Sequence, residues 1–397
     1  MRTKTKLISG LLIALLFLTA CAQLPQPSDP AAETTRAPGP ALFEADYALL
    51  WEILESDYPY LPYLREKGVD IEGLREKYLQ QAVEAANAKE FAGVVAKLFA
   101  SLKNTGHLSL LGPEMFSDMY GYCVLSPGSE AGERLREMLI KAAESGYYTA
   151  PETYSEDLSA YGSFPEIGVS YDEESETLIF KIPTFYTTTI ERDSSLYEET
   201  IAQYPEAKNI VFDVTGNSGG DTRYWETNII ARFGEDCTLK WRSFYRSSPN
   251  NDMIAGEYAE IHSVSDADSV PEWVIASGLD RYLCFEEHIE GRDAIRSEAK
   301  RWVLADAGVF SAAEQFVCFC KATGWATVVG KKTRGDGLGF EPALHLLPDS
   351  GLLFRFSMSA GENPDGTMNV EGTVPDIVLD YASISCLLRL IRDKQGD

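Results

Sequence analysis

Apolar residues recur at helical spacing near the start of the chain. The positions that would share one helical face are Tyr47, Leu50, Trp51 and Leu54, followed later by Phe91, Val94, Val95 and Leu98. Side chains three and four residues apart lie on the same side of an α-helix. The pattern therefore predicts a small helical module over residues 42–110.

The next stretch, residues 111–165, is rich in Ser, Gly, Tyr and Glu and carries no chemical motif. Its periodicity predicts one helix near residues 131–145. We interpret the stretch as a linker or insert of unknown role.

Strand and helix patterns alternate after residue 166. Strands are predicted at residues 178–185, 209–214 and 302–305, with helices near 196–204 and from Tyr224. Such alternation is typical of an α/β domain, with a buried central sheet between helices. We expect this domain to span residues 166–390.

The N-terminus has the pattern of a bacterial secretory signal. Arg2, Lys4 and Lys6 precede an apolar run over residues 7–18, which is too short for a comfortable membrane span. The following Leu-Thr-Ala-Cys21 resembles a lipobox, which implies a signal peptide at 1–20 and a lipidated Cys21. Residues 21–41 are predicted to be a flexible tether, and the protein is expected in the cell envelope, outside the cytoplasm. The alternative is an ordinary signal with a chance cysteine.

The net charge and the cysteine spacing indicate which partners and metals the protein is not expected to bind. The 397-residue chain has a formal net charge of −26, which would repel nucleic acids and anionic membrane surfaces. Beyond Cys21 there are six cysteines, without the CxxC or clustered His/Cys spacing of a zinc site. We therefore expect no metal or cofactor, and interpret most of these cysteines as buried thiols, a structural disulfide being the alternative.

Ser311 stands where a small-residue turn reaches a predicted helix start. A serine there lies beside unpaired backbone N–H groups, and the N–H of Ala312 could hold the oxyanion of an acyl-transfer intermediate. The alternative is structural. Serine is a preferred N-cap residue, and Glu314 would complete a capping box.

Two further segments carry candidate chemistry. Residues 213–220 form a glycine-rich turn between a strand and a helix, without the Lys-Ser/Thr ending or GxGxxG spacing of a phosphate loop. His107, one of four histidines, follows Asn104-Thr-Gly106. For His345, within Ala-Leu-His-Leu-Leu, a strand position is the simpler interpretation.

Taken in order, these segments resemble the carboxyl-terminal processing (tail-specific) proteases and the catalytic core of tricorn protease. Their motifs Asp-x-Arg-x-Asn-x-Gly-Gly, Ser-x-x-Glu, Ala-x-Val-Val-Gly and Gly-x-x-Pro-Asp correspond to residues 213–220, 311–314, 326–330 and 372–376. The resemblance covers about residues 167–380. It implies a ClpP/crotonase-like layered core of sheet and helices, and serine peptidase activity on a peptide or protein substrate.

The resemblance also implies roles. Ser311 would be the nucleophile and His107 the general base. Thr215 replaces the motif's arginine, and Asp336 stands where dyad-type members carry a lysine. Because Lys331 and Lys332 are out of register, the resemblance shifts to the tricorn-like branch, in which a histidine activates the serine.

That branch has a serine before the histidine, where this chain has Gly106. The missing hydroxyl would come from Thr105 or Ser109. The orienting carboxylate would be Glu371, with Asn369 as the alternative at the matching position. The oxyanion donors would be the N–H groups of Ala312 and Gly219, with Gly220 as the alternative.

Processing proteases usually carry a PDZ domain, but residues 111–165 are short for one. Gly337-Leu-Gly-Phe340 has the letters of a carboxylate-binding loop, yet it lies inside the catalytic core. Two other functions stay open: a catalytically inactive lipoprotein that binds peptides or small ligands on the same fold, and a lipoprotein that only contacts other envelope proteins.

Overall fold

The computed structural model describes residues 40–126, 132–153, 165–292, 295 and 297–395. The predicted signal peptide, Cys21 and most of the tether lie outside these residues. The described chain forms two compact units. The helical unit contains the described residues before 157 together with Phe244–Leu283 and Phe340–Ser359, and the sheet unit contains the remainder. The predicted contiguous boundaries did not anticipate this interleaving.

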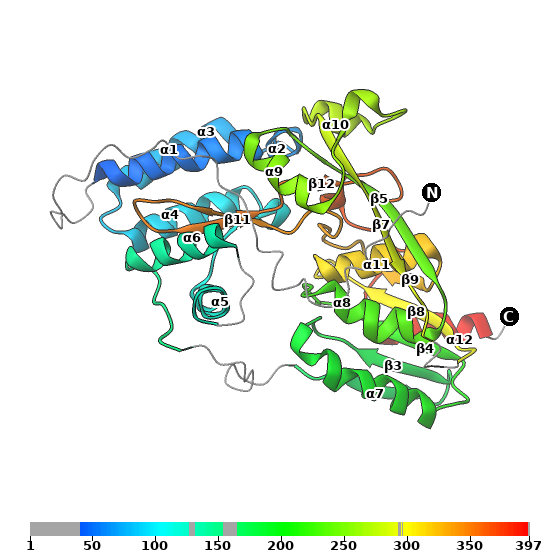
Figure 1. The fold of residues 1–397 in the computed structure, drawn as a ribbon. Coiled ribbons are helices and arrows are strands. Elements are labelled where there is room, and N and C mark those ends of the chain that lie inside the picture. Colours follow the sequence, from blue (N-terminus) through cyan, green and yellow to red (C-terminus); the bar gives the residue numbers. More distant parts are fainter. Residues whose placement is uncertain (1–39, 127–131, 154–164, 293–294, 296, 396–397) are drawn as a thin grey trace, which may run out of the picture. The chain divides into compact units, whose positions relative to one another are not determined.

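Four helices open the helical unit, as the apolar spacing predicted (Figure 1). They are α1 (Pro40–Asp57), α2 (Leu61–Glu66), α3 (Ile71–Glu84) and α4 (Ala88–Ser101). Polar caps fix two of the starts, because Asp70 accepts from Gly73 N–H and Asn87 accepts from Glu90 N–H. The eight predicted apolar positions are all buried.

The rest of the helical unit includes residues predicted to be a linker. Its helices are α5 (Pro113–Tyr120), α6 (Glu133–Glu144), α9 (Pro249–Tyr258) and α10 (Glu272–Ala276). The expected helix near 131–145 is α6, whereas α5 was not predicted. Both pack in one apolar cluster with Leu344 and Leu353. These leucines belong to a three-stranded antiparallel sheet of order β1-β11-β10, made of β1 (Ser109–Leu110), β11 (Leu353–Phe356) and β10 (Ala343–Leu346). His345 is in a strand, as expected.

The sheet unit is built on a six-stranded sheet of order β13-β9-β8-β4-β3-β2. Its strands are β2 (Gly168–Asp172), β3 (Thr177–Lys181), β4 (Asn209–Asp213), β8 (Lys300–Ala305), β9 (Thr327–Gly330) and β13 (Ile377–Val378). All neighbours pair in parallel except β2, which is antiparallel to β3.

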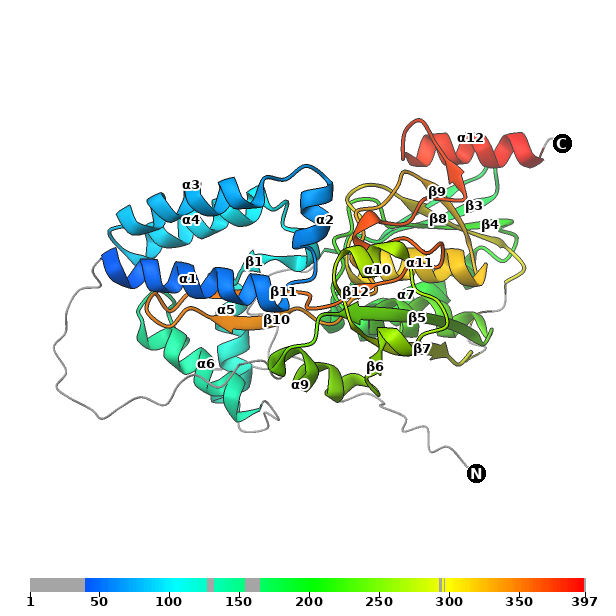
Figure 2. The ribbon, with the colours of Figure 1, turned by 90° about the horizontal axis from the view of Figure 1, so that it is seen from above.

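Helices cover both faces of this sheet (Figure 2). Alternate residues of a strand point to opposite faces, so Phe212 packs with α7 (Ile190–Gln203), α8 (Thr222–Trp225) and α11 (Ala312–Thr323), whereas Val211 packs with α12 (Ile384–Gln395). The sheet unit is therefore the layered α/β core that the alternation predicted.

A further sheet has the order β12-β5-β7-β6. It contains β12 (Ala360–Gly361), β5 (Cys237–Tyr245), β7 (Arg281–Ile289) and β6 (His262–Ser263). The residues of β5 and β7 are divided between the two units.

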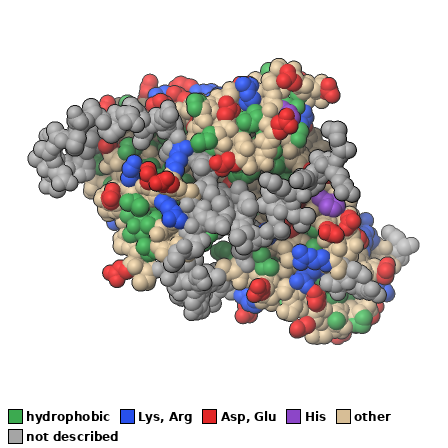
Figure 3. Space-filling model, viewed as in Figure 1, with side chains coloured by type: hydrophobic (Ala, Val, Ile, Leu, Met, Phe, Trp, Pro, Cys, Tyr) green, Lys and Arg blue, Asp and Glu red, His purple; other side chains and the backbone are tan. Residues whose placement is uncertain are grey.

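Carboxylate side chains are spread over the face shown in Figure 3, interspersed with Lys and Arg. The six cysteines of the described residues are free thiols, of which Cys123, Cys318 and Cys320 are buried. Within the described ranges, no helix has the length and apolarity needed to cross a membrane.

Candidate active site

Ser311 is the N-cap of α11, in the turn that follows β8. Its backbone has φ 56° and ψ −128°, a conformation that side-chain-bearing residues rarely adopt. The turn is held in place because Ser311 N–H donates to the carbonyl of Gly335 at 3.2 Å. The side chain makes no capping hydrogen bond and is half-buried. Ser311 therefore has a strained backbone at the helix start, and its hydroxyl does not serve as a helix cap.

Glu314 does not close a capping box. Its carboxylate is buried and accepts a hydrogen bond from the Thr373 hydroxyl at 2.6 Å. Burial raises the pKa of Glu314 to about 7, against the opposing effect of the hydroxyls of Thr333 and Thr373. The capping-box interpretation is thus wrong: the Ser-x-x-Glu motif ties the helix start to the Gly-x-x-Pro-Asp segment.

Gly219 lies directly against Ser311. A Cβ atom added to Gly219 would lie 2.9 Å from Ser311 Cβ and 2.9 Å from Ala312 N, and its φ is +105°. Only glycine permits this approach. The N–H of Gly219 donates to Asn217 Oδ1 at 2.9 Å, so it is already engaged. Among the described residues, the N–H groups of Gly220 and Ala312 have no hydrogen-bond partner.

Asn217 fixes the glycine turn beside the serine. Its side chain is fully buried and donates to the carbonyl of Ile182 at 3.1 Å. Its own carbonyl accepts from Phe310 N–H at 3.2 Å. The turn is thereby hydrogen-bonded to the residue that immediately precedes Ser311.

Asp336 follows the residue that binds Ser311 N–H. It has φ 68°, is buried, and forms a reciprocal pair with Asn369: Asp336 N–H donates to the Asn369 carbonyl, and Asn369 Nδ2 donates to Asp336 Oδ1, both at 2.9 Å. Glu371, in contrast to the buried Asp336, is partly exposed. Its side chain is 28% exposed and lies 3.5 Å from Lys332 Nζ.

His107 belongs to the helical unit, in a short 3₁₀ turn over Thr105–His107. Its Nδ1 is hydrogen-bonded to Ser357 Oγ at 3.2 Å, and Ser357 N–H donates to the Gly106 carbonyl at 2.7 Å. The hydroxyls expected for this task bind elsewhere: Thr105 donates to the Leu102 carbonyl and Ser109 to the His107 carbonyl.

Ser357 was missed because it lies 250 residues from His107 in the chain. The pairing of β1 with β11 brings the two segments together. Gly106 has a local explanation, since a Cβ atom there would lie 2.2 Å from the ring of Tyr60. A serine at this position would clash, so the orienting hydroxyl is that of Ser357, the residue that follows β11.

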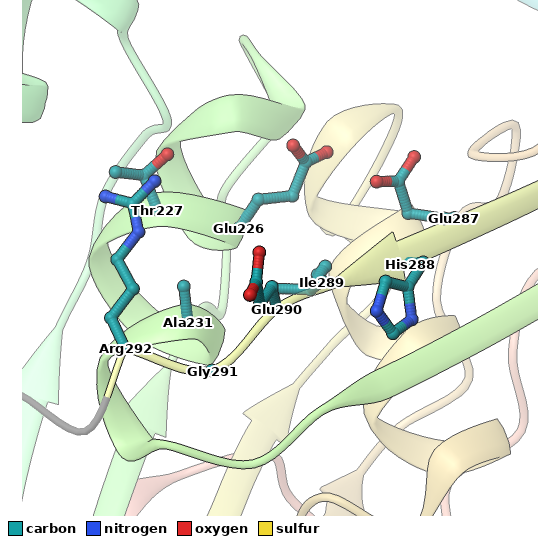
Figure 4. Close-up of a pocket in the computed structure, with 9 residues that line it drawn as sticks. All are labelled: Glu226, Thr227, Ala231, Glu287, His288, Ile289, Glu290, Gly291 and Arg292. Atoms are coloured by element: carbon teal, nitrogen blue, oxygen red, sulfur yellow. The ribbon is translucent and has the colours of Figure 1, made fainter. Parts of the chain in front are cut away.

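A cavity of about 420 Å³ in the sheet unit contains none of the predicted site residues (Figure 4). It is lined by Glu226, Thr227, Ala231, Glu287, His288, Ile289, Glu290, Gly291 and Arg292. Burial, together with the charge of Glu287, raises the pKa of Glu226 to about 8. Arg292 lies on the side of the cavity opposite Glu287 (Figure 4).

A strained serine at a helix start, beside a glycine turn and two unpartnered N–H groups, is the arrangement of a serine hydrolase on an α/β fold. Residues 176–379 match the model of peptidase family S41. The chain belongs to this family, that of the carboxyl-terminal processing proteases, and is a serine-type peptidase.

Solved structures share the fold at low sequence identity. Mature CPAF is 12% identical, with a TM-score of 0.55 over 90% of this chain and 99% of that one. CPAF in complex with lactacystin is 13% identical, with a TM-score of 0.55 over 90% and 97%. A candidate peptidase from Parabacteroides merdae is 16% identical, with a TM-score of 0.54 over 89% and 93%. No match was found among curated proteins.

Proposed function

We propose that this S41 peptidase cleaves peptide or protein substrates through an acyl-enzyme on Ser311, with His107 as the general base. The observation that carries the proposal is the backbone of Ser311, which is strained at φ 56° while its hydroxyl takes no part in capping. Strain of this kind costs roughly 1–3 kcal/mol and is typical of functional positions.

In the first step His107 Nε2 takes the Ser311 hydroxyl proton while Oγ attacks the substrate carbonyl carbon. The tetrahedral intermediate then loses its C–N bond, and the imidazolium gives its proton to the leaving amine. Water, deprotonated by the same imidazole, hydrolyses the ester and restores Ser311. The hydrogen bond between Ser357 Oγ and Nδ1 supports this assignment, because it orients the imidazole through Nδ1, the nitrogen that does not take the proton in this step.

The oxyanion donors in this proposal are the N–H groups of Ala312 and Gly220. Both lack a partner among the described residues, whereas Gly219 N–H is bound to Asn217. Gly219 contributes in another way, since its missing side chain lets the turn approach Ser311. Glu371 receives no role in these steps because its carboxylate pairs with Lys332.

Hydrolysis of a peptide mixture, read by mass spectrometry of the products, tests this function. We expect new peptide termini with the wild type and none with Ser311→Ala. Saturable binding of peptides without any product would instead favour the inactive binding lipoprotein.

Secretion and lipid attachment at Cys21 belong to the same proposal and rest on the sequence of residues 1–21. Labelling of cells with a palmitate analogue should mark the wild type but not Cys21→Ser. Equal labelling of the two, or none, would contradict the anchor.

A further inference from the structure

Lys181 lies at the end of β3, beside the strand that leads into the glycine turn. It is the register partner of Asp213, the last residue of β4. Lys181 Nζ donates to Asp213 Oδ1 at 3.0 Å and to the carbonyl and hydroxyl oxygens of Thr215 at 2.5 Å each. One ammonium group thus binds three oxygens near the start of the turn, one of Asp213 and two of Thr215.

The same carboxylate oxygen of Asp213 also organises the turn from within. It accepts from Thr215 N–H at 2.9 Å and from the Thr215 hydroxyl at 2.7 Å. Asp213 Oδ1 therefore receives three donors, of which Lys181 is the only cation among its described partners. The Asp213 side chain is 12% exposed, so this negative charge is largely removed from water and needs a counter-charge.

The first half of the turn determines where its second half lies. Three residues separate Thr215 from the Gly219–Gly220 peptide. The middle one, Asn217, is bonded to the carbonyl of Ile182, the residue after Lys181. The first half of the turn is thus fastened to the β3 end by the Lys181 ammonium and its middle by the Ile182 carbonyl. Its second half is held further along the same segment, because the Gly219 carbonyl accepts from Phe185 N–H at 3.0 Å and from the Thr184 hydroxyl at 3.2 Å. Releasing the Lys181 bonds would loosen residues 213–215, from which the chain continues through Asn217 to the glycines beside Ser311.

We propose that Lys181 is a positioning residue for the oxyanion-binding turn, in place of the arginine that the motif has at position 215. The inference rests on the proposed acyl-transfer function, because it assigns Lys181 an effect on acylation of Ser311. Lys181 acts through Asp213 and Thr215 and touches no reacting atom.

The test compares Lys181→Met, which keeps the length of the side chain but removes its charge, with Lys181→Arg. Lys208→Met is the matched control, because Lys208 pairs with Glu176 at the opposite end of β4 and its side chain is 63% exposed. Two quantities are measured: kinact and KI for a fluorophosphonate probe, and amide hydrogen exchange of peptides covering residues 213–220.

We expect Lys181→Met to lower kinact by roughly ten- to a hundredfold with little change in KI, since misplaced donors weaken the transition state rather than probe binding. Exchange should become faster within residues 213–220, Lys181→Arg should restore most of both quantities, and Lys208→Met should match the wild type. Unchanged exchange in Lys181→Met, or an unchanged kinact, would overturn the inference.

The experiment distinguishes failure of the proposed function from failure of the Lys181 inference. If the wild type does not react with the probe at all, the acyl-enzyme proposal fails, and hydrogen exchange alone decides whether Lys181 holds the turn.

Discussion

At the scale of single residues, the site depends on how closely Gly219 approaches Ser311. We expect Gly219→Ala to lower the rate of reaction with a fluorophosphonate by about a hundredfold or more, because the new Cβ would lie 2.9 Å from both Ser311 Cβ and Ala312 N. The measurement is the second-order rate constant of labelling, read by intact mass.

Gly216→Ala is the matched control for this substitution. Gly216 also has positive φ, +77°, but a Cβ atom there meets nothing within 4 Å. It should lose about 1 kcal/mol of stability from backbone strain and keep most of its reactivity. Equal loss of reactivity in the two variants would show that strain, and not contact with Ser311, is responsible.

Ser357 carries a second prediction at this scale. Its hydroxyl is bonded to His107 Nδ1, whereas the hydroxyl of Ser109 is bonded only to the His107 carbonyl among its described partners. Removing the first bond frees the imidazole to rotate and to exchange tautomers. We expect Ser357→Ala to slow labelling by roughly tenfold and to shift the pH dependence of the rate, with Ser109→Ala unchanged. An identical pH profile for Ser357→Ala would contradict this role.

At the scale of elements, α11 begins on a buried carboxyl group. The pKa of Glu314 is about 7 in the folded chain because of burial, above its ordinary value of 4.5. The folded state therefore keeps a proton that the unfolded state releases, so this contribution to stability is present below pH 4.5 and is lost as the pH rises to about 7.

Replacing Glu314 with Gln should remove this dependence. The unfolding midpoint of Glu314→Gln minus that of the wild type should be larger at pH 8 than at pH 5, as measured by calorimetry. If the difference between the two midpoints were the same at both pH values, the titration of Glu314 would not be linked to folding.

At the scale of the whole molecule, a buried histidine in the helical unit opposes folding in acid. His345 is stacked on Phe354 and Phe356, with ring centroids 5.1 and 4.6 Å away. Burial, assisted by the charge of Arg134, lowers its pKa to about 3 from 6.5. Between these values the unfolded state binds the proton, so stability is lost as the pH falls below 6.5.

His345→Phe keeps the stacking and removes the titration. Between pH 6.5 and pH 5 the wild type should lose about 2 kcal/mol more than this variant, at about 1.4 kcal/mol per pH unit. Denaturant unfolding at both pH values measures the difference. Equal losses would contradict the assignment.

The sequence could predict features that depend on neighbouring residues, and could not predict those that depend on distant ones. Local patterns correctly predicted the helices of residues 42–110, strands at β3, β4 and β8, and the start of α11 at Ser311, because periodicity and capping are properties of neighbouring residues. The partners of the candidate site residues were harder to predict. Strand pairing between distant segments brings Ser357 to His107 and Lys181 to Asp213, and no local pattern specifies that pairing.

The division into two compact units was not predicted, because it too depends on contacts between segments that are distant in the chain. Residues 244–283 and 340–359 belong to the same compact unit as the N-terminal helices, although they lie far from those helices in the chain. The capping box with Glu314 stayed an alternative in the sequence because a capping box and a buried carboxylate bonded to Thr373 have the same local pattern.

Labelling of the soluble chain from Ala22 onward with a fluorophosphonate is the most direct test of the central claim that His107 activates Ser311. Intact mass should show one adduct on the wild type, carried by the peptide that contains Ser311, and none on Ser311→Ala or His107→Ala. A wild type that stays unmodified, a Ser311→Ala variant that is still labelled, or a His107→Ala variant labelled as fast as the wild type would contradict the account.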